Sequence, residues 1–398
     1  MTFWQLRRPK QKNSYKLCRL MMITTLTDPE IYELAHTVLS QITDEINDEH
    51  YAPSGGLLSL SWSTAPGFNA WAESDTIEGG PPQHKIVLHY ELARLLYRDA
   101  EGFCKFVSEK HTQEWLKDVF KYTTYPNLPE IFTLEDCVRN MFFASLTWVY
   151  FHELGHLAQE HGFVRKASRS DPVQRIIQEL DASGASPLTG RAAEISHVTE
   201  LAADFEATTH CLIEMARQFL QGPLVSDEEG ADLFVAGVYL LACSMSCIFY
   251  RFNNGRCISS KLPIVGSHPH PVYRLEINVP HAYEFAEMII NGASFKADRR
   301  ELVIKTKQAA DLGALYHNYF MNGWNSDYTN LFVKGLPQRP EFRAYSQRLI
   351  DLWDEILPEI VDRRHFGTQF GLLRFTTQYR EILEMHKAIE SNSSSPET

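Results

Sequence analysis

The sequence predicts an α+β protein that is mainly helical. Its 398 residues, of which 44% are hydrophobic, can bury a large core arranged as two lobes. Short apolar runs separated by glycine- and proline-containing turns occur between residues 57 and 89, a pattern typical of a few strands. Much of the remaining sequence carries apolar residues at helical spacing, so we expect helices on either side of a small sheet.

The sequence between residues 22 and 108 contains five expected elements. Apolar side chains recur along one face after residue 28, which predicts an amphipathic helix, and alternating apolar runs further on predict strands. Clusters of glycine and proline separate these segments. The expected elements are a helix at Asp28–His50, strands at Leu57–Trp62, Phe68–Trp71 and Lys85–His89, and a helix at Tyr90–Ser108.

A long apolar helix is expected before residue 152. The run from Val138 to Phe151 is apolar on nearly every side, so this helix should pass through the core rather than lie on the surface. Thr133, with Asp136 three residues later, fits the N-cap of such a helix. The motif HELGH follows at residues 152–156, and its three ionisable side chains would be costly to bury unless they were paired or bound a metal.

This HExxH motif predicts a metal site. His152 and His156 are four residues apart, so on a helix they project from one face and can offer two imidazole nitrogens to one ion, usually zinc. Glu153 can take a proton from an attacking water and return it to a leaving amine. A buried, internally paired polar cluster is the alternative interpretation.

A catalytic zinc site takes three protein ligands and keeps its fourth position open. A histidine six residues after His156 would indicate a metzincin, but that position is Gly162, and His161 stands one residue short. The third ligand is therefore expected further along the chain.

Glu200 and Asp204 are four residues apart, so we expect both on one helix face. Glu200 would bind the metal, and Asp204 would accept a hydrogen bond from the free ring N–H of a ligand histidine. Ala203 and Ala207 share this face, where small residues would let a second helix approach closely. An ordinary acidic helix surface is the alternative.

HELGH followed by a helix with ExxxD resembles the gluzincin metallopeptidases. The segment Ser267–Leu275 is similar to the HPxxxxR element of the CAAX prenyl protease and heat-shock membrane protease family and, more loosely, to Lit-type phage-exclusion proteases. The resemblance implies a zincin-like domain with Zn²⁺ as cofactor and a small sheet whose edge strand binds extended peptide. It also implies that His268 lies near the substrate and stabilises an oxyanion, and that Arg274 braces the site. Solvated histidines in a proline-stiffened turn are the alternative for His268 and His270.

The sequence departs from the membrane family in its hydrophobic segments. The connection between Gly162 and Gly190 is polar, and Ser183–Pro187 within it is expected to be a mobile loop over the site. Leu233–Tyr250 has eighteen uncharged, mostly apolar residues, at the lower limit for a membrane span. Because this segment is isolated and contains serines and a glycine, we expect a core helix beside the metal helices and no membrane partner.

Charge and cysteine content limit the classes of function. The net charge is −12 and the first twenty residues are basic, so the remainder is strongly acidic and nucleic-acid binding is not expected. The seven cysteines are odd in number and scattered, which favours a reducing cytoplasm over a disulfide framework. Cys243 and Cys247 could bind a metal, although buried structural thiols are more common at such positions.

The chain is expected to divide into four successive segments. Residues 1–21 should be a basic, disordered arm, with a transit-like segment or a true start at Met21 or Met22 as alternatives. Residues 22–295 should form the zincin-like metallopeptidase domain, residues 296–390 a helical accessory lobe, and residues 391–398 a disordered tail. Beyond the zinc region we expect helices at His281–Ile290, Ala309–Tyr319, Pro340–Leu357 and Gln378–Ile389, and a loop at Trp324–Tyr328.

Together these features predict a zinc-dependent endopeptidase that acts on a protein or peptide substrate. His152, His156 and Glu200 would be the ligands, and the residue after the first histidine would be the general base. The alternative is a zinc-stabilised scaffold or regulatory module that does not cut peptides. Four protein ligands would indicate such a closed site, and three would indicate an open one.

Overall fold

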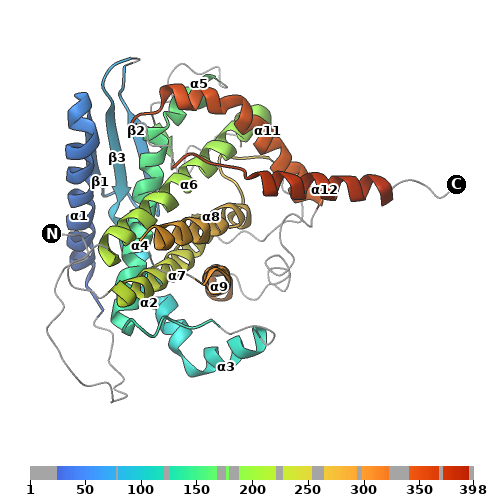
Figure 1. The fold of residues 1–398 in the computed structure, drawn as a ribbon. Helices are drawn as coiled ribbons and strands as arrows, with labels where there is room; N and C mark the ends of the chain where they lie inside the picture. Colours follow the sequence, from blue (N-terminus) through green and yellow to red (C-terminus); the bar gives the residue numbers. More distant parts are fainter. Residues whose placement is uncertain are drawn as a thin grey trace.

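The computed structural model describes residues 25–77, 79–120, 126–167, 176–178, 188–220, 227–252, 264–293, 298–321, 340–366 and 371–393. Its strands are β1 (Leu57–Ser63), β2 (Ala70–Ser74), β3 (Gln83–His89) and β4 (Ile176–Gln178). Its helices are α1 (Asp28–Ile46), α2 (Tyr90–Ser108), α3 (Lys110–Val119), α4 (Leu134–Ala158), α5 (His161–Ala167), α6 (Gly190–Phe219), α7 (Asp227–Phe252), α8 (Pro271–Gly292), α9 (Arg299–Met321), α11 (Pro340–Arg363) and α12 (Thr377–Ser393). The fold is α+β and mainly helical, with one small mixed sheet, as the sequence predicts (Figure 1).

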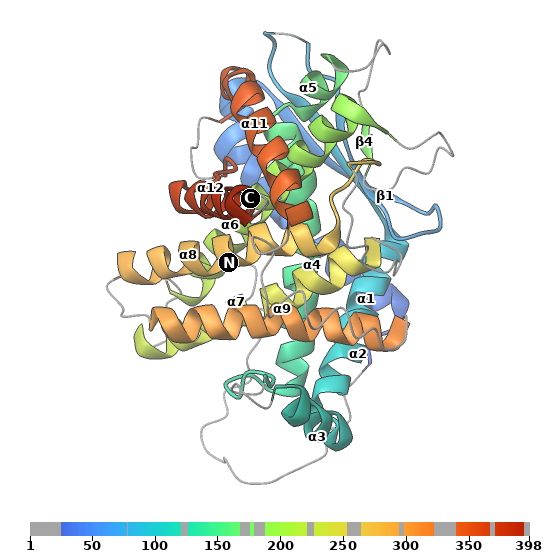
Figure 2. The ribbon, with the colours of Figure 1, turned by 90° about the vertical axis from the view of Figure 1, so that its right-hand side faces the viewer.

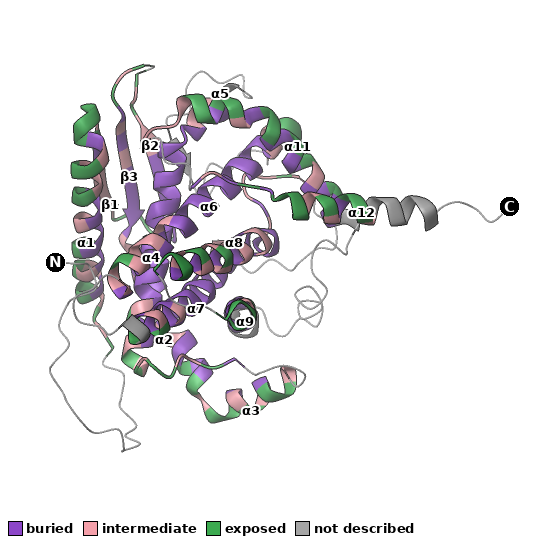
Figure 3. Ribbon diagram, viewed as in Figure 1, coloured by how far each residue is buried: buried purple, intermediate pink, exposed green. Residues whose placement is uncertain are grey.

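The HExxH motif lies on α4, which begins where the sequence predicts. Thr133 and Asp136 form a capping box, in which Thr133 Oγ1 accepts a hydrogen bond from the Asp136 amide at 3.1 Å. Every residue from Met141 to Ala158 is buried, so α4 passes through the core (Figure 3). The expected central helix is confirmed.

The sheet has the strand order β1-β3-β2-β4. β1 pairs with β3 in parallel, and β2 pairs with β3 and β4 in antiparallel fashion. β1 and β2 flank the turn at residues 65–67, yet they do not pair, because β3 lies between them. The residues of β3 from Ile86 to His89 are all buried, and a strand buried on both faces takes a central position.

The three expected strands are all present, although β2 begins at Ala70 rather than at Phe68. α4 contacts both β2 and β3, and α1 contacts β1. The small sheet therefore lies beside the HExxH helix, as expected (Figure 1).

α4 and α6 approach each other closely at Gly155. A Cβ atom at this position would stand 3.2 Å from the Cα and 3.3 Å from the carbonyl oxygen of Ala203 on α6. Because only glycine leaves room for that backbone, the HExxH helix can lie directly against the helix that carries the acidic residues. The predicted close approach at Ala203 is therefore present.

We expect Gly155→Ala to destabilise the protein, even though alanine is the better helix former. The added methyl group meets backbone atoms that cannot rotate away, so overpacking costs about 1–3 kcal/mol against a propensity gain of about 1 kcal/mol. Urea denaturation measures the change in the free energy of unfolding. Gly292→Ala is the control, since a Cβ there meets nothing within 4 Å. A Gly155→Ala protein as stable as wild type would contradict the close packing.

The apolar segment Leu233–Tyr250 lies within α7, which packs against α4, α8 and α9. In the part of the chain that the structure describes, one helix, Glu229–Phe252, is long and apolar enough to cross a membrane, and 94% of its most apolar window is buried. Figure 2 shows α9 running alongside α7, so that α9 covers one side of α7. The expectation of a buried helix packed beside α4 is confirmed.

The helices that follow are longer than the sequence predicts. α8, α9, α11 and α12 contain the expected segments, and each extends beyond them. α12 runs to Ser393 and so includes the first three residues of the expected tail 391–398, of which residues 394–398 lie outside the described part of the chain. One hydrophobic cluster includes side chains from α1 through α12, so residues on both sides of the expected boundary at 295 share a core.

Several expectations lie outside the described residues. They concern the basic segment 1–21, the loops Ser183–Pro187 and Trp324–Tyr328, and the residues Cys18 and Cys257. The described cysteines are all buried and free, namely Cys104, Cys137, Cys211, Cys243 and Cys247. Cys243 and Cys247 are therefore buried thiols, as expected.

Candidate metal centre

Two helices and the start of a third carry the expected site residues. α4 supplies His152, Glu153 and His156, α6 supplies Glu200 and Asp204, and the segment at the start of α8 supplies His268 and Arg274. All of these residues except His268 are at most 2% exposed. The site therefore lies inside the protein, where α4, α6 and α8 meet.

Three of these residues form a potential ligand group. The ligand atoms of His152, His156 and Glu200 all lie within 4.8 Å of one another. The two imidazole Nε2 atoms are 3.1 Å apart, and each lies 3.3 Å from an oxygen of the Glu200 carboxylate. Ligands about 2.0–2.1 Å from a tetrahedral zinc ion stand roughly 3.3 Å apart, so these separations match such a geometry.

Asp204 lies beside Nδ1 of the His152 ring. A carboxylate can only accept hydrogen bonds, and Asp204 Oδ1 lies 2.9 Å from His152 Nδ1. A neutral His152 therefore carries its proton on Nδ1 and presents the Nε2 lone pair to the group. Arg274 donates hydrogen bonds of 2.8 and 2.6 Å to the two oxygens of Asp204 and holds that carboxylate in place.

A second chain of hydrogen bonds orients His156. Glu206 and the carbonyl of Ala202 are acceptors, so Gln159 turns its amide nitrogen towards them and its Oε1 towards His161 Nε2, at 3.3 Å. His161 donates through Nε2 and accepts at Nδ1, which lies 2.8 Å from His156 Nδ1. His156 therefore donates through Nδ1 and also presents a bare Nε2 to the group.

The atoms of His152, His156 and Glu200 that face one another are thus all hydrogen-bond acceptors. Two imidazole lone pairs and a carboxylate face one another in a buried space, which is costly unless a proton or a cation lies among them. Burial lowers the pKa of His156 to about 4, so this ring does not keep a second proton at neutral pH. These residues can hold a metal ion, and their nitrogen and carboxylate donors fit zinc.

Arg165 on α5 keeps the carboxylate of the group anionic. It donates to Glu200 Oε1 at 2.6 Å and to Thr199 Oγ1 at 2.8 Å. Burial acts to raise the pKa of Glu200, but His268, His156 and Arg165 outweigh it and hold that pKa well below its usual range. Glu200 therefore stays charged and available to a cation at neutral pH.

Two residues of this site are not predicted from the sequence. The sequence indicates His161 only as a possible ligand, whereas the structure places it behind His156 as a hydrogen-bond acceptor. Arg165 lies at the start of the connection that was expected to be polar, yet it is only 4% exposed and faces Glu200. Their spacing of four residues directly after the motif, on one face of a short helix, is the signal that could have found them.

His268 is the most exposed of the expected site residues, with 19% of its side chain accessible. Its Nε2 lies 3.4 Å from Glu200 Oε2, and its Nδ1 lies 2.7 Å from the hydroxyl of Ser267. Ser196 on α6 donates to the carbonyl of Ser267 at 2.8 Å and fixes this loop beside the group. His270 caps α8 through its Nδ1, so it is not simply a solvated turn residue. The group is therefore most open on the side of His268.

Buried histidines predict how stability depends on pH. Burial lowers the pKa to about 4 for His156 and to about 3 for His197, His281 and His317, against a usual value of 6.5. Below pH 6.5 the unfolded chain binds protons at these rings and the folded protein does not, so the free energy of unfolding falls as the pH decreases towards 4. Each ring contributes about 1.4 kcal/mol per pH unit in this window.

We therefore expect the metal-free protein to lose several kcal/mol of stability between about pH 6.5 and 4. Urea denaturation in the presence of a chelator at several pH values measures the slope. His317→Leu should reduce that slope, because neither ring nitrogen of His317 has a hydrogen-bond partner among the described residues. An unchanged slope in this variant would show that His317 does not remain neutral in the folded protein.

The site consists of two histidines and one glutamate buried between two helices. The carboxylate of Asp204 lies behind His152, and the imidazole of His161 lies behind His156. The chain matches no protein-family model, no curated protein and no solved structure. The assignment of a function therefore rests on the arrangement of its own residues.

Proposed function

We propose that the protein is a zinc-dependent endopeptidase of the gluzincin type, with its zincin-like domain in residues 22–295. The observation that carries the proposal is that Nε2 of each histidine of the motif lies 3.3 Å from an oxygen of the Glu200 carboxylate, with Glu153 on the same helix. Asp204 and Arg274, behind His152, support the same assignment, because a catalytic zinc ligand is usually oriented in this way.

Each residue has a distinct role in this proposal. Zinc bound by His152, His156 and Glu200 would supply a Lewis acid that polarises the peptide carbonyl. Glu153 accepts a proton from the attacking water at its carboxylate and passes it to the leaving amine. His268, at the open side of the group, donates a hydrogen bond to the developing oxyanion.

The proposed substrate is a protein or peptide bound in extended form by main-chain pairing with an edge of the sheet. β1 and β4 are the two edge strands of the described sheet. We favour β4, because it lies in the connection between α5 and α6. α6 contains Glu200, and α5 supplies Arg165, which contacts it. The acidic composition and the free cysteines favour a cytoplasmic protein that does not bind nucleic acid.

One observation favours the second candidate, a zinc-stabilised scaffold or regulatory module that does not cut peptides. The three ligands and Glu153 are all at most 2% exposed, and His268 Nε2 lies 3.4 Å from Glu200 Oε2. Four protein ligands would make a closed, structural site. X-ray absorption of the zinc-loaded protein distinguishes the candidates, since the endopeptidase requires three protein ligands.

Removal of zinc is expected to abolish peptide hydrolysis, because no Lewis acid would then polarise the carbonyl of the substrate. Activity is measured on a peptide library before and after dialysis against a chelator, and zinc content is measured in the same samples. Addition of Zn²⁺ should restore cleavage, and dialysis without chelator is the control. Cleavage that persists in protein shown to be free of metal would refute the proposed function.

A further inference from the structure

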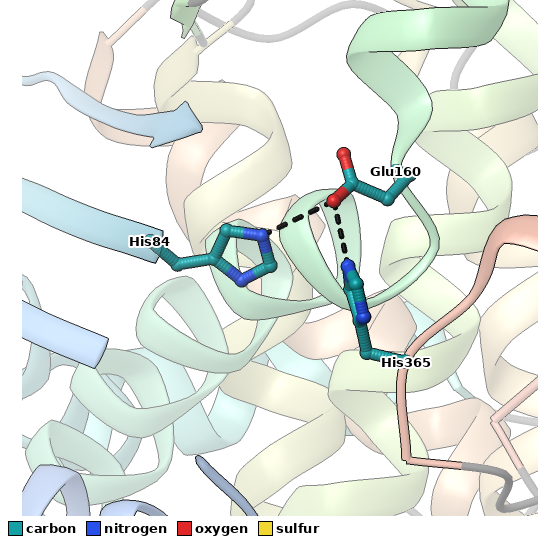
Figure 4. Close-up of side chains that lie close together, drawn as sticks. All are labelled: His84, Glu160 and His365. Carbon is teal, nitrogen blue, oxygen red and sulfur yellow. Dashed lines mark hydrogen bonds and ion pairs between the residues drawn. The ribbon is translucent and has the colours of Figure 1, made fainter. Parts of the chain in front are cut away.

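A second group of potential ligands lies apart from the candidate centre. His84 on β3, Glu160 just after α4 and His365 just after α11 have ligand atoms within 4.8 Å of one another. Both Nε2 atoms point at the same carboxylate oxygen, with His84 Nε2 at 3.3 Å and His365 Nε2 at 2.7 Å from Glu160 Oε1 (Figure 4). Residues far apart in the sequence thus converge on one point.

This second group is buried and supported from behind. The side chains of His84 and Glu160 are 0% and 4% exposed, and that of His365 is 18% exposed. The hydroxyl of Tyr51 lies 2.8 Å from His84 Nδ1, which orients the ring and leaves Nε2 directed at Glu160. Tyr51 also packs against Phe366, with ring centroids 4.6 Å apart. The aromatic rings of Tyr51 and Phe366 therefore pack against the two histidines of the group.

The backbone is strained at both sides of this group. Glu160 has φ +49° and Phe366, next to His365, has φ +69°, and no other residue except glycine has a positive φ in the described part of the chain. Glu160 follows the C-cap of α4, a position that glycine or asparagine usually occupies. A larger residue there is strained, and such strain persists where a side chain must be held in place.

The end of α4 also favours a cation at this point. The amide of His365 donates a hydrogen bond of 2.8 Å to the carbonyl of Ala158, the last residue of α4. The group therefore sits at the C-terminus of a long helix, where the backbone carbonyls carry partial negative charge. A carboxylate at this end of a helix is unfavourable unless a positive charge accompanies it.

We propose that His84, Glu160 and His365 form a second metal site, which takes a divalent first-row transition ion such as Zn²⁺. Two imidazoles and one carboxylate are a donor set that such ions prefer. Because the three residues come from the sheet, the end of α4 and the segment after α11, the bound ion fastens the C-terminal helices to the body of the protein. The proposal does not depend on the proposed peptidase activity.

Hydrogen bonds alone give a competing arrangement. In it, both rings donate from Nε2 to Glu160 without an ion, and a glutamine at position 365 would preserve a donor. A metal site would instead lose its ion, because a neutral amide is a poor ligand for such metals. His365→Gln therefore separates the two arrangements, and Glu160→Gln tests the carboxylate. His50→Gln is the matched control, since His50 also packs on Phe366, at 5.6 Å, but lies outside the group.

The experiment is a titration of the metal-free full-length protein with Co²⁺, followed by its visible absorption, and a measurement of bound Zn²⁺ by mass spectrometry. Wild type and His50→Gln should bind about two ions per chain, and His365→Gln and Glu160→Gln about one. His156→Gln, which disrupts the candidate centre, should also bind about one. Zinc should raise the melting temperature of His156→Gln, and this increase should disappear when His365→Gln is added.

The outcomes separate this proposal from the proposed function. A wild-type protein that binds a single ion, retained in His365→Gln and lost in His156→Gln, would overturn the second site and leave the first intact. A single ion retained in His156→Gln and lost in His365→Gln would support the second site and remove the zinc centre of the peptidase. A wild-type protein that binds two ions supports both sites even where one variant fails to fold.

Discussion

Glu153→Gln is expected to abolish peptide hydrolysis while the protein keeps its zinc and its fold. Glutamine has nearly the same shape as glutamate and fits the fully buried position, but its amide cannot accept the proton of the attacking water. Loss of a general base lowers kcat by about 10²–10⁴-fold, with a smaller effect expected on KM. Peptide cleavage, zinc content and thermal unfolding are measured on the same preparation.

Glu359→Gln is the control for this variant, because Glu359 lies on the exposed surface of α11 and pairs with Arg363 there. Its activity should equal that of wild type. A Glu153→Gln protein with full activity would end the assignment of Glu153 as general base. A zinc-free Glu153→Gln protein would instead place this side chain among the metal ligands.

Glu200→Ala and Asp204→Ala are expected to differ in how much zinc they lose and in how much stability they lose. Glu200→Ala removes a proposed ligand, so most of the bound zinc should be lost. Asp204→Ala leaves the ligands in place but frees the ring of His152, which should weaken zinc binding by about 10–100-fold. It also leaves the guanidinium of Arg274 buried without its carboxylate, which should cost about 3–5 kcal/mol of stability.

A double variant separates the two effects of Asp204. In Asp204→Leu/Arg274→Leu both buried charges are removed together, so much of the lost stability should return, while zinc binding stays weak. Zinc content at fixed free zinc and urea denaturation measure the two quantities independently. If Asp204→Ala is the zinc-free protein and Glu200→Ala binds nearly normally, the ligand assignment is reversed.

The sequence was sufficient for most of the long helices and for placing the expected ligands on helix faces, because both depend on local spacing. The capping box at Thr133 and the apolar run after it identified α4, and four-residue spacing placed His152 and His156 on one face. The same spacing placed Glu200 and Asp204 together on α6. Helical hydrogen bonds join residues four apart, so a short stretch of sequence contains the whole pattern.

Contacts between distant segments could not be read in this way. The order of the strands was one example, because the central place of β3 depends on what covers both of its faces. Arg165 was another, since its residue type is typical of an exposed connection and only the fold buries it against Glu200. Burial of a charged residue depends on its partner, and no local pattern identifies that partner.

The sequence by itself thus determined the central helix, its buried face and the residue types that can hold a metal beside α6. Only the tertiary structure decided which nitrogen of each histidine faces the group, because Asp204 lies beside Nδ1 of His152 and His161 lies beside Nδ1 of His156. The convergence of His84, Glu160 and His365 was likewise decided by the fold. Local spacing specifies a helix face, whereas the meeting of residues hundreds of positions apart depends on how the whole chain buries its apolar surface.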